Sequence, residues 1–118
     1  MPDHWSDAEP VVRLLAGRWT LPLLSELVGE GRRYQDLHTA LADISHKVLT
    51  DTLRRVEGDG LVIRTVDPKR IETATLYQLT DLSYSLDEAL AALAIWTNRN
   101  WDKVEAARHS WNERSSAH

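Results

Sequence analysis

The hydrophobic pattern changes its period partway along the chain, and this change limits the fold more than any other feature. Between residues 45 and 58, apolar side chains recur every three or four positions, which predicts an amphipathic helix. The segments 61–66 and 75–80 are rich in Val, Ile, Thr and Tyr, and they predict two strands joined by a long loop. A turn of about three residues separates the helix from a shorter one expected at 34–41. Two helices joined by a tight turn must therefore lie next to a β-hairpin.

Further helices are expected on both sides of this segment. Upstream, the apolar spacing predicts one helix over 8–16 and a second that Thr20 would cap and the glycines of 29–31 would end. Downstream, an apolar stripe runs from Leu82 to about residue 97, and the TNRN segment is expected to interrupt it before another helix begins. The expected fold class is α+β, mainly α: a winged helix-turn-helix with a two-stranded β-hairpin wing and additional N- and C-terminal helices.

The helix expected at 45–58 has the features of a DNA-reading helix. Ser45 is a good N-cap, and it places His46 and Lys47 in the first turn, where the positive end of the helix macrodipole disfavours cations. A DNA phosphate or a guanine edge would turn that penalty into an attraction. Thr50 and Arg54 lie opposite the apolar face. A polar helix face alone is more often only solvated, but the tight turn and the hairpin beside it favour DNA.

Charge is distributed unevenly along the chain. The formal net charge of −4 argues by itself against a nucleic-acid partner. Residues 13–70 nevertheless hold ten Lys and Arg against eight Asp and Glu, a local charge of +2, and the local field governs a phosphate contact. Arg32 and Arg33 could hold a phosphate, and Lys69 and Arg70 at the wing tip could grip the backbone. Solubility alone also favours charged loops.

Four motifs, in this order, resemble the signatures of HxlR-type winged-helix transcriptional regulators: GRWTLPLLSEL, RRYQDL, ISHKVLTDTLRRVEGDGLVIR and LYQLTDL. The resemblance runs from about residue 11 to 97. It implies a homodimer that binds a pseudo-palindromic operator in double-stranded DNA, with helix 45–58 in the major groove and the wing 67–74 on the backbone. It also implies these DNA-facing residues on the helix: Ser45, Lys47, Thr50 and Arg54. Arg18 and Arg33 would contact the backbone together with the wing.

The sequence departs from the family pattern in several places. The family usually has a basic residue where Ser25 stands, and a glycine where Ser83 stands. Its wing is usually proline-rich, whereas Thr73, Ala74 and Thr75 precede the second strand here. Some family members sense electrophiles through a cysteine, and this chain has none.

Tryptophan is frequent, with five residues and no phenylalanine. Trp19 is expected in the core, whereas the others lie in the terminal segments, and tryptophan is enriched at interfaces. We predict one domain over 1–118, in which 11–80 form the DNA-binding core and the segments 1–10 and 81–118 dimerise. The residues predicted to line the dimer interface or an effector pocket are Trp5, Leu93, Trp96, Trp101, Val104 and Trp111. The alternative is that Trp96 and Trp101 line a pocket for a small, flat aromatic effector.

Composition argues against several other functions. Without cysteine there is no disulfide and no thiolate metal site. The five histidines lack metal-binding spacing, and no Gly-rich phosphate loop or Gly-x-Ser-x-Gly elbow occurs, so we expect no metal, no cofactor and no enzyme. No apolar run approaches the ~20 residues that span a bilayer, which predicts a cytoplasmic protein. The remaining alternative is a winged-helix protein–protein interaction module that does not bind DNA.

Overall fold

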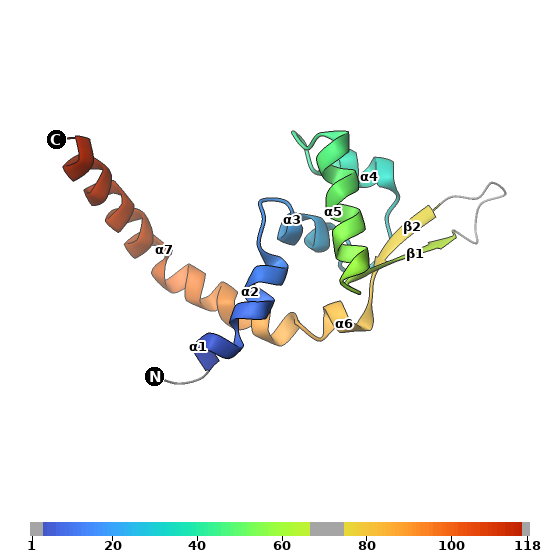
Figure 1. Cartoon of the computed structure of the whole chain (residues 1–118), viewed down its shortest axis with the longest axis horizontal. Helices are drawn as coiled ribbons and strands as arrows, with labels where there is room; N and C mark the ends of the chain where they lie inside the picture. Colours follow the sequence, from blue (N-terminus) through green and yellow to red (C-terminus); the bar gives the residue numbers. More distant parts are fainter. Residues whose placement is uncertain (1–3, 67–74, 117–118) are drawn as a thin grey trace. The chain divides into compact units, whose positions relative to one another are not determined.

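The computed structural model describes residues 4–66 and 75–116, which form seven helices and two strands (Figure 1). In chain order these are α1 (His4–Asp7), α2 (Glu9–Leu15), α3 (Thr20–Glu26), α4 (Tyr34–Ala40), α5 (His46–Gly58), β1 (Val62–Val66), β2 (Thr75–Leu79), α6 (Asp81–Tyr84) and α7 (Asp87–Ser116). The chain divides into two compact units, residues 1–84 and 85–118. The expected fold class, mainly helical with a two-stranded antiparallel sheet, is confirmed. The hairpin tip at 67–74 lies outside the described residues.

The start of α5 is the one the sequence predicts. The Ser45 hydroxyl accepts a hydrogen bond from the Val48 N–H at 3.1 Å, so Ser45 is the N-cap. The helix then runs through Gly58, and Gly60, with φ +79°, supplies the left-handed residue that turns the chain towards β1. Val48 is exposed although it is apolar, because it lies in the first turn of α5 at the edge of the buried face.

The core of the first unit lies among α3, α4, α5 and the base of β1. Leucine dominates it, and each fully buried leucine contributes about 1.5–3 kcal/mol relative to an exposed one. The Asp43 backbone, with φ +75°, makes the tight turn that brings α4 and α5 together. The buried apolar residues are Leu23, Leu24, Leu27, Leu37, Leu41, Ile44, Leu49, Leu53, Val56, Leu61 and Val62.

Thr20 does not cap α3, contrary to the prediction. The N-cap is Trp19, and Thr20 is a fully buried residue inside the helix. Its hydroxyl donates to the Ala16 carbonyl at 2.9 Å and accepts a hydrogen bond from Arg55 Nη2. Arg55 also donates to the Leu14 carbonyl at 3.4 Å. The hydroxyl therefore links the end of α2 to α5 instead of satisfying the first turn of its own helix.

A further segment, at Arg32, pairs with the edge of the hairpin, and the sequence did not predict this contact. β1 and β2 pair antiparallel with Arg64 opposite Tyr77. On the other edge of β2, the Arg32 and Tyr77 backbones exchange two hydrogen bonds of 2.9 and 2.7 Å. Gly31 permits this approach, because a Cβ there would lie 2.7 Å from Gln78 Cγ. Tyr77 is thus held from both sides.

The second unit contains one uninterrupted helix. α7 has 30 residues and a length of about 45 Å. The predicted break at TNRN is wrong, because Thr97 and Asn100 bond back to the carbonyls of Leu93 and Trp96, at 2.8 and 3.0 Å. The predicted stripe from Leu82 is also wrong, since Leu82 belongs to the separate helix α6. None of the helices that the structure describes is both long and apolar enough to cross a bilayer.

Candidate nucleic-acid interface

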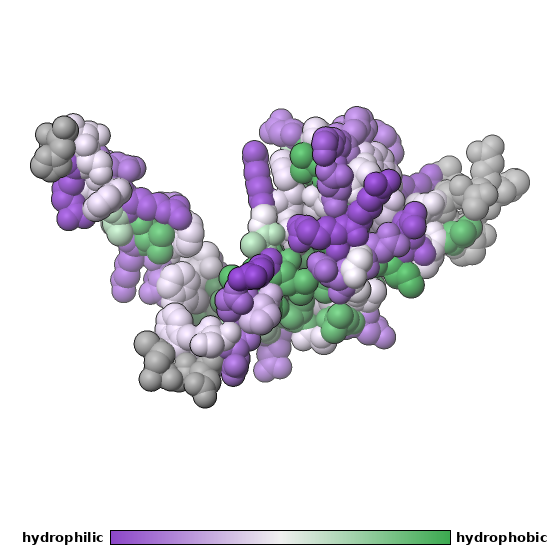
Figure 2. All heavy atoms as spheres, in the orientation of Figure 1, coloured by the Kyte–Doolittle hydropathy of each residue, from purple (hydrophilic) through white to green (hydrophobic). Residues whose placement is uncertain are grey.

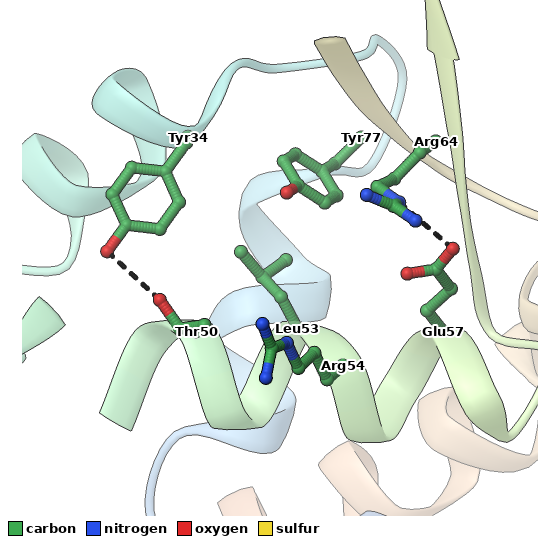
Figure 3. Close-up of a pocket in the computed structure, with 7 residues that line it drawn as sticks. All are labelled: Tyr34, Thr50, Leu53, Arg54, Glu57, Arg64 and Tyr77. Carbon is green, nitrogen blue, oxygen red and sulfur yellow. Dashed lines mark hydrogen bonds and ion pairs between the residues drawn. The ribbon is translucent and has the colours of Figure 1, made fainter. Parts of the chain in front are cut away.

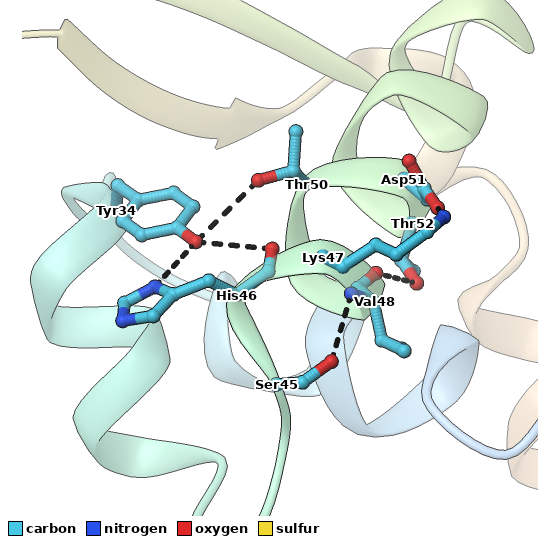
Figure 4. A network of polar contacts seen from close by, with 8 residues as sticks. All are labelled: Tyr34, Ser45, His46, Lys47, Val48, Thr50, Asp51 and Thr52. Carbon is cyan, nitrogen blue, oxygen red and sulfur yellow. Dashed lines mark hydrogen bonds and ion pairs between the residues drawn. The ribbon is translucent and has the colours of Figure 1, made fainter.

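Lys47 and Asp51 form an ion pair on the first two turns of α5 (Figure 4). Lys47 Nζ lies 2.8 Å from Asp51 Oδ2. This hydrogen bond, together with the attraction between the charges, raises the pKa of Lys47 and lowers the pKa of Asp51. Asp51 therefore offsets part of the dipole penalty on a lysine in the first turn. Both groups are exposed, so the pair is weak and Lys47 can exchange Asp51 for an incoming phosphate.

The His46 side chain is held by α4. The Tyr34 hydroxyl lies 2.9 Å from His46 Nδ1, and the His38 and His46 rings stack with centroids 3.9 Å apart. The same hydroxyl lies 3.4 Å from Thr50 Oγ1 and donates to the His46 carbonyl at 3.3 Å (Figure 4). The sequence predicts His46 as a possible DNA contact and gives no sign that Tyr34 binds it. Contact between positions 12 apart carries no sequence signal here, so the link was missed.

Thr50 and Arg54 open onto a cleft of about 270 Å³ between α5, the start of α4 and the hairpin (Figure 3). Arg64 Nε donates to Glu57 Oε2 at 3.1 Å across this cleft. Among the described residues, the Arg54 guanidinium has no hydrogen-bond partner, although its charge helps to lower the pKa of Asp51. The lining residues are Tyr34 of α4; Thr50, Leu53, Arg54 and Glu57 of α5; and Arg64 and Tyr77 of the hairpin.

Residues 14–105, which include this cleft, match the HxlR-like helix-turn-helix family. The chain belongs to the HxlR-like family. It is 33% identical over 101 residues to the HTH-type transcriptional regulator YtfH of Escherichia coli K12, covering 83% of this chain and 77% of that protein. A MarR-family transcriptional regulator structure from Enterococcus faecalis V583 has a TM-score of 0.76 at 33% identity, covering 87% of this chain and 93% of that one.

The reduced form of the redox regulator HypR has the same fold: the TM-score is 0.73 at 24% identity, and the match covers 85% of this chain and 98% of that one. These likenesses make this HxlR-family protein a DNA-binding transcriptional regulator of the winged helix-turn-helix type, and not an enzyme. The sequence resemblance to HxlR-type regulators is thereby confirmed.

The other predicted DNA contacts of this HxlR-family protein lie off α5. Arg18 is in the connection between α2 and α3, where its guanidinium lies 4.8 Å from the centroid of the half-buried Trp19 ring. Arg33 precedes α4, and its N–H donates to Asp36 Oδ2 at 3.4 Å. Lys69 and Arg70 lie outside the described residues. Ser45 caps α5, and α5 itself carries Lys47, Thr50 and Arg54, whereas Arg18 and Arg33 lie elsewhere; all of these DNA contacts stay predictions.

The tryptophans of α7 do not share one face. Trp96 and Trp111 line a shallow groove of about 520 Å³ along the helix. Trp101 lies outside that groove, because five residues on a continuous helix rotate the side chain by about 500°, or 140° beyond a full turn. The Arg108 guanidinium lies 5.2 Å from the centroid of the Trp101 ring. The groove also includes Asn100, Lys103, Val104, Ala107 and Arg108.

Proposed function

We propose that this regulator binds a pseudo-palindromic operator in duplex DNA as a homodimer, with α5 in the major groove and the hairpin on the adjacent backbone. The observation that carries the proposal is the division of α5 into two faces. Leu49, Leu53 and Val56 are buried, whereas Lys47 and Arg54 project into solvent. Ser45 fixes where the helix begins, so these exposed side chains project from its first three turns. That is the part of the helix that a helix-turn-helix places in the groove.

The apolar surface of α7 supports the homodimer. Leu93, Ile95, Trp96 and Trp111 are each more than half exposed, and Figure 2 shows apolar residues among the hydrophilic ones along this helix. Exposed apolar patches of this kind mark interaction sites. A second copy would bury this surface and place two α5 helices on half-sites about 34 Å apart, one turn of DNA.

A flat aromatic effector is the second candidate for the α7 surface. The groove volume of about 520 Å³ falls within the ~300–1,000 Å³ of small-molecule sites, and two indole rings line it. Titration of candidate aromatics against tryptophan fluorescence tests this role. Quenching by one compound, together with loss of that response in Trp96→Ala, supports an effector site, and a flat response from every compound contradicts it.

A gel-shift titration with the region upstream of the chain's own gene tests DNA binding. We expect saturable, salt-sensitive binding, which Lys47→Ala and Arg54→Ala weaken without unfolding the protein. Loss of a base contact costs about 1–3 kcal/mol on the operator alone, whereas loss of a phosphate contact weakens binding to every sequence and flattens the salt dependence. Wild-type affinity in both variants contradicts the assignment of α5. Absence of binding to any duplex instead favours a protein–protein interaction module.

A further inference from the structure

We propose that the cleft between α5 and the hairpin binds one phosphate group of the DNA backbone, held by Arg54 and Arg64 with the Tyr77 hydroxyl. This inference rests on the proposed DNA-binding function and adds a contact site to it. Arg64, Tyr34 and Tyr77 are not among the DNA-facing residues that the family resemblance implies. They line the cleft from β1, α4 and β2 respectively.

The donors of the cleft suit a phosphate. Guanidinium groups match phosphate oxygens with two parallel N–H donors, and a phenol adds a single O–H donor. Two arginines against the single carboxylate of Glu57 leave the lining with a net positive charge. The volume of about 270 Å³ lies just below the ~300–1,000 Å³ of typical small-molecule sites, so it favours one compact anionic group over a larger effector.

The cleft is also held in place before any ligand arrives. Arg64 and Tyr77 are cross-strand neighbours, so their side chains project from the same face of the hairpin. The Tyr77 backbone is bonded on its other edge to Arg32, and the Tyr34 hydroxyl is tied to His46 and Thr50. The two tyrosines that line the cleft are therefore held in place before a phosphate arrives, and this lowers the ordering cost of binding.

Arg54 and Arg64 differ in their partners. The Arg54 guanidinium has no hydrogen-bond partner among the described residues, whereas Arg64 Nε donates a hydrogen bond to Glu57. Glu57 therefore competes with a phosphate for Arg64, and it also repels the phosphate directly. Position supports a DNA source for the anion, because Thr50 lines the same cleft and lies on the α5 face proposed to enter the groove (Figure 3).

Arg64→Gln and Glu57→Gln separate this role from a structural one. If Arg64 holds a phosphate, Arg64→Gln weakens DNA binding, whereas Glu57→Gln strengthens it, by roughly two- to fivefold. If Arg64 only ties the hairpin to α5 through Glu57, both substitutions weaken binding, and the proposal is overturned. Arg13→Gln is the matched control, because Arg13 also pairs with a glutamate, Glu9, but lies on α2 away from the cleft.

The measurement is fluorescence anisotropy with the upstream duplex and with an unrelated duplex, at salt concentrations between about 50 and 200 mM. We expect Arg64→Gln to lower the slope of log K against log salt by about one per protomer on both duplexes, since a phosphate contact carries no sequence information. Tyr77→Phe keeps the ring and the backbone bridge, and it should weaken binding to both duplexes equally. An unchanged slope in Arg64→Gln, with normal wild-type binding, overturns the cleft and leaves the proposed function intact.

Inorganic phosphate distinguishes the two sources of the anion. At constant ionic strength, we expect millimolar inorganic phosphate to leave the NMR chemical shifts of the cleft residues unchanged in the DNA-free protein. One free ion lacks the further contacts that a DNA strand makes. Saturable shifts in the wild-type protein that disappear in Arg64→Gln, without a change in the DNA salt slope, would assign the cleft to free phosphate and overturn a backbone site. Failure of wild-type protein to bind any duplex would instead remove the proposed function itself.

Discussion

Helices α5 and α7 both carry large apolar side chains, yet only α5 gathers them on one face that is covered within the chain. Leu49 on α5 is 0% exposed, whereas Leu93 on α7 is 58% exposed, and no residue of α7 is buried. The apolar side chains of α5 close the core of the first unit, while those of α7 are available to a second molecule. The comparison separates the part of the sequence that folds the protomer from the part that we propose assembles it.

Among the variants that test this comparison, Leu49→Ala is expected to have the largest effect, a loss of unfolding free energy. Removing a fully buried leucine costs about 2–5 kcal/mol of unfolding free energy, because both transfer energy and packing are lost. Urea denaturation measures it. Leu93→Ala is the control on α7: its effect should be small at low protein concentration and grow with concentration, as expected for an interface residue. A concentration-independent loss of similar size in both variants would contradict the distinction between the helices.

Trp111→Ala tests the assembly role of α7 directly. Tryptophan at the centre of an interface typically contributes 2 kcal/mol or more to association, so we expect dimer dissociation to increase by roughly 30-fold or more. Sedimentation velocity over a range of concentrations measures the dissociation of the dimer. The circular dichroism of the protein should stay unchanged. A wild-type protein that sediments as a monomer at micromolar concentration contradicts the dimer before any variant is made.

Ser45→Ala sharpens the description of α5 by removing its N-cap. The Ser45 hydroxyl accepts from the Val48 N–H, and loss of such a cap costs about 1 kcal/mol of stability. Thermal unfolding detects this as a lower midpoint. Ser45→Gly should cost only a few tenths of a kcal/mol, because glycine is tolerated at an N-cap. Equal losses in the two variants would show that the hydroxyl acts through something other than the cap.

The Lys47–Asp51 pair should produce the smallest effect, a weak dependence of stability on pH. The pKa of Lys47 is raised, so its contribution is complete below its unfolded pKa and is lost as pH rises through the folded pKa. The pKa of Asp51 is lowered, so its contribution is complete above its unfolded pKa and is lost as pH falls through the folded pKa. Asp51→Asn should flatten the acidic limb of the stability profile, and an unchanged acidic limb would contradict the pairing.

The sequence predicted those parts of the protein that depend on neighbouring residues. The start of α5 follows from Ser45, the buried face from the spacing of Leu49, Leu53 and Val56, and the hairpin from a period of two. Local rules failed at Thr20 and at TNRN. In both places a side-chain hydroxyl or amide bonds to a backbone carbonyl four residues earlier, an arrangement that fits the interior of a helix as well as its end.

The sequence by itself determined the family and the fold class, because these depend on the order and spacing of four motifs. Only the tertiary structure joined Tyr34 to His46 and Thr50, and placed Arg64 and Tyr77 beside Arg54. These residues come from α4, α5 and the hairpin, and each is polar or aromatic in a way that many surfaces would tolerate. Their meeting depends on the turn at Asp43 and on the bridge between Arg32 and Tyr77, which set the distances between elements and leave no periodic signal in the chain.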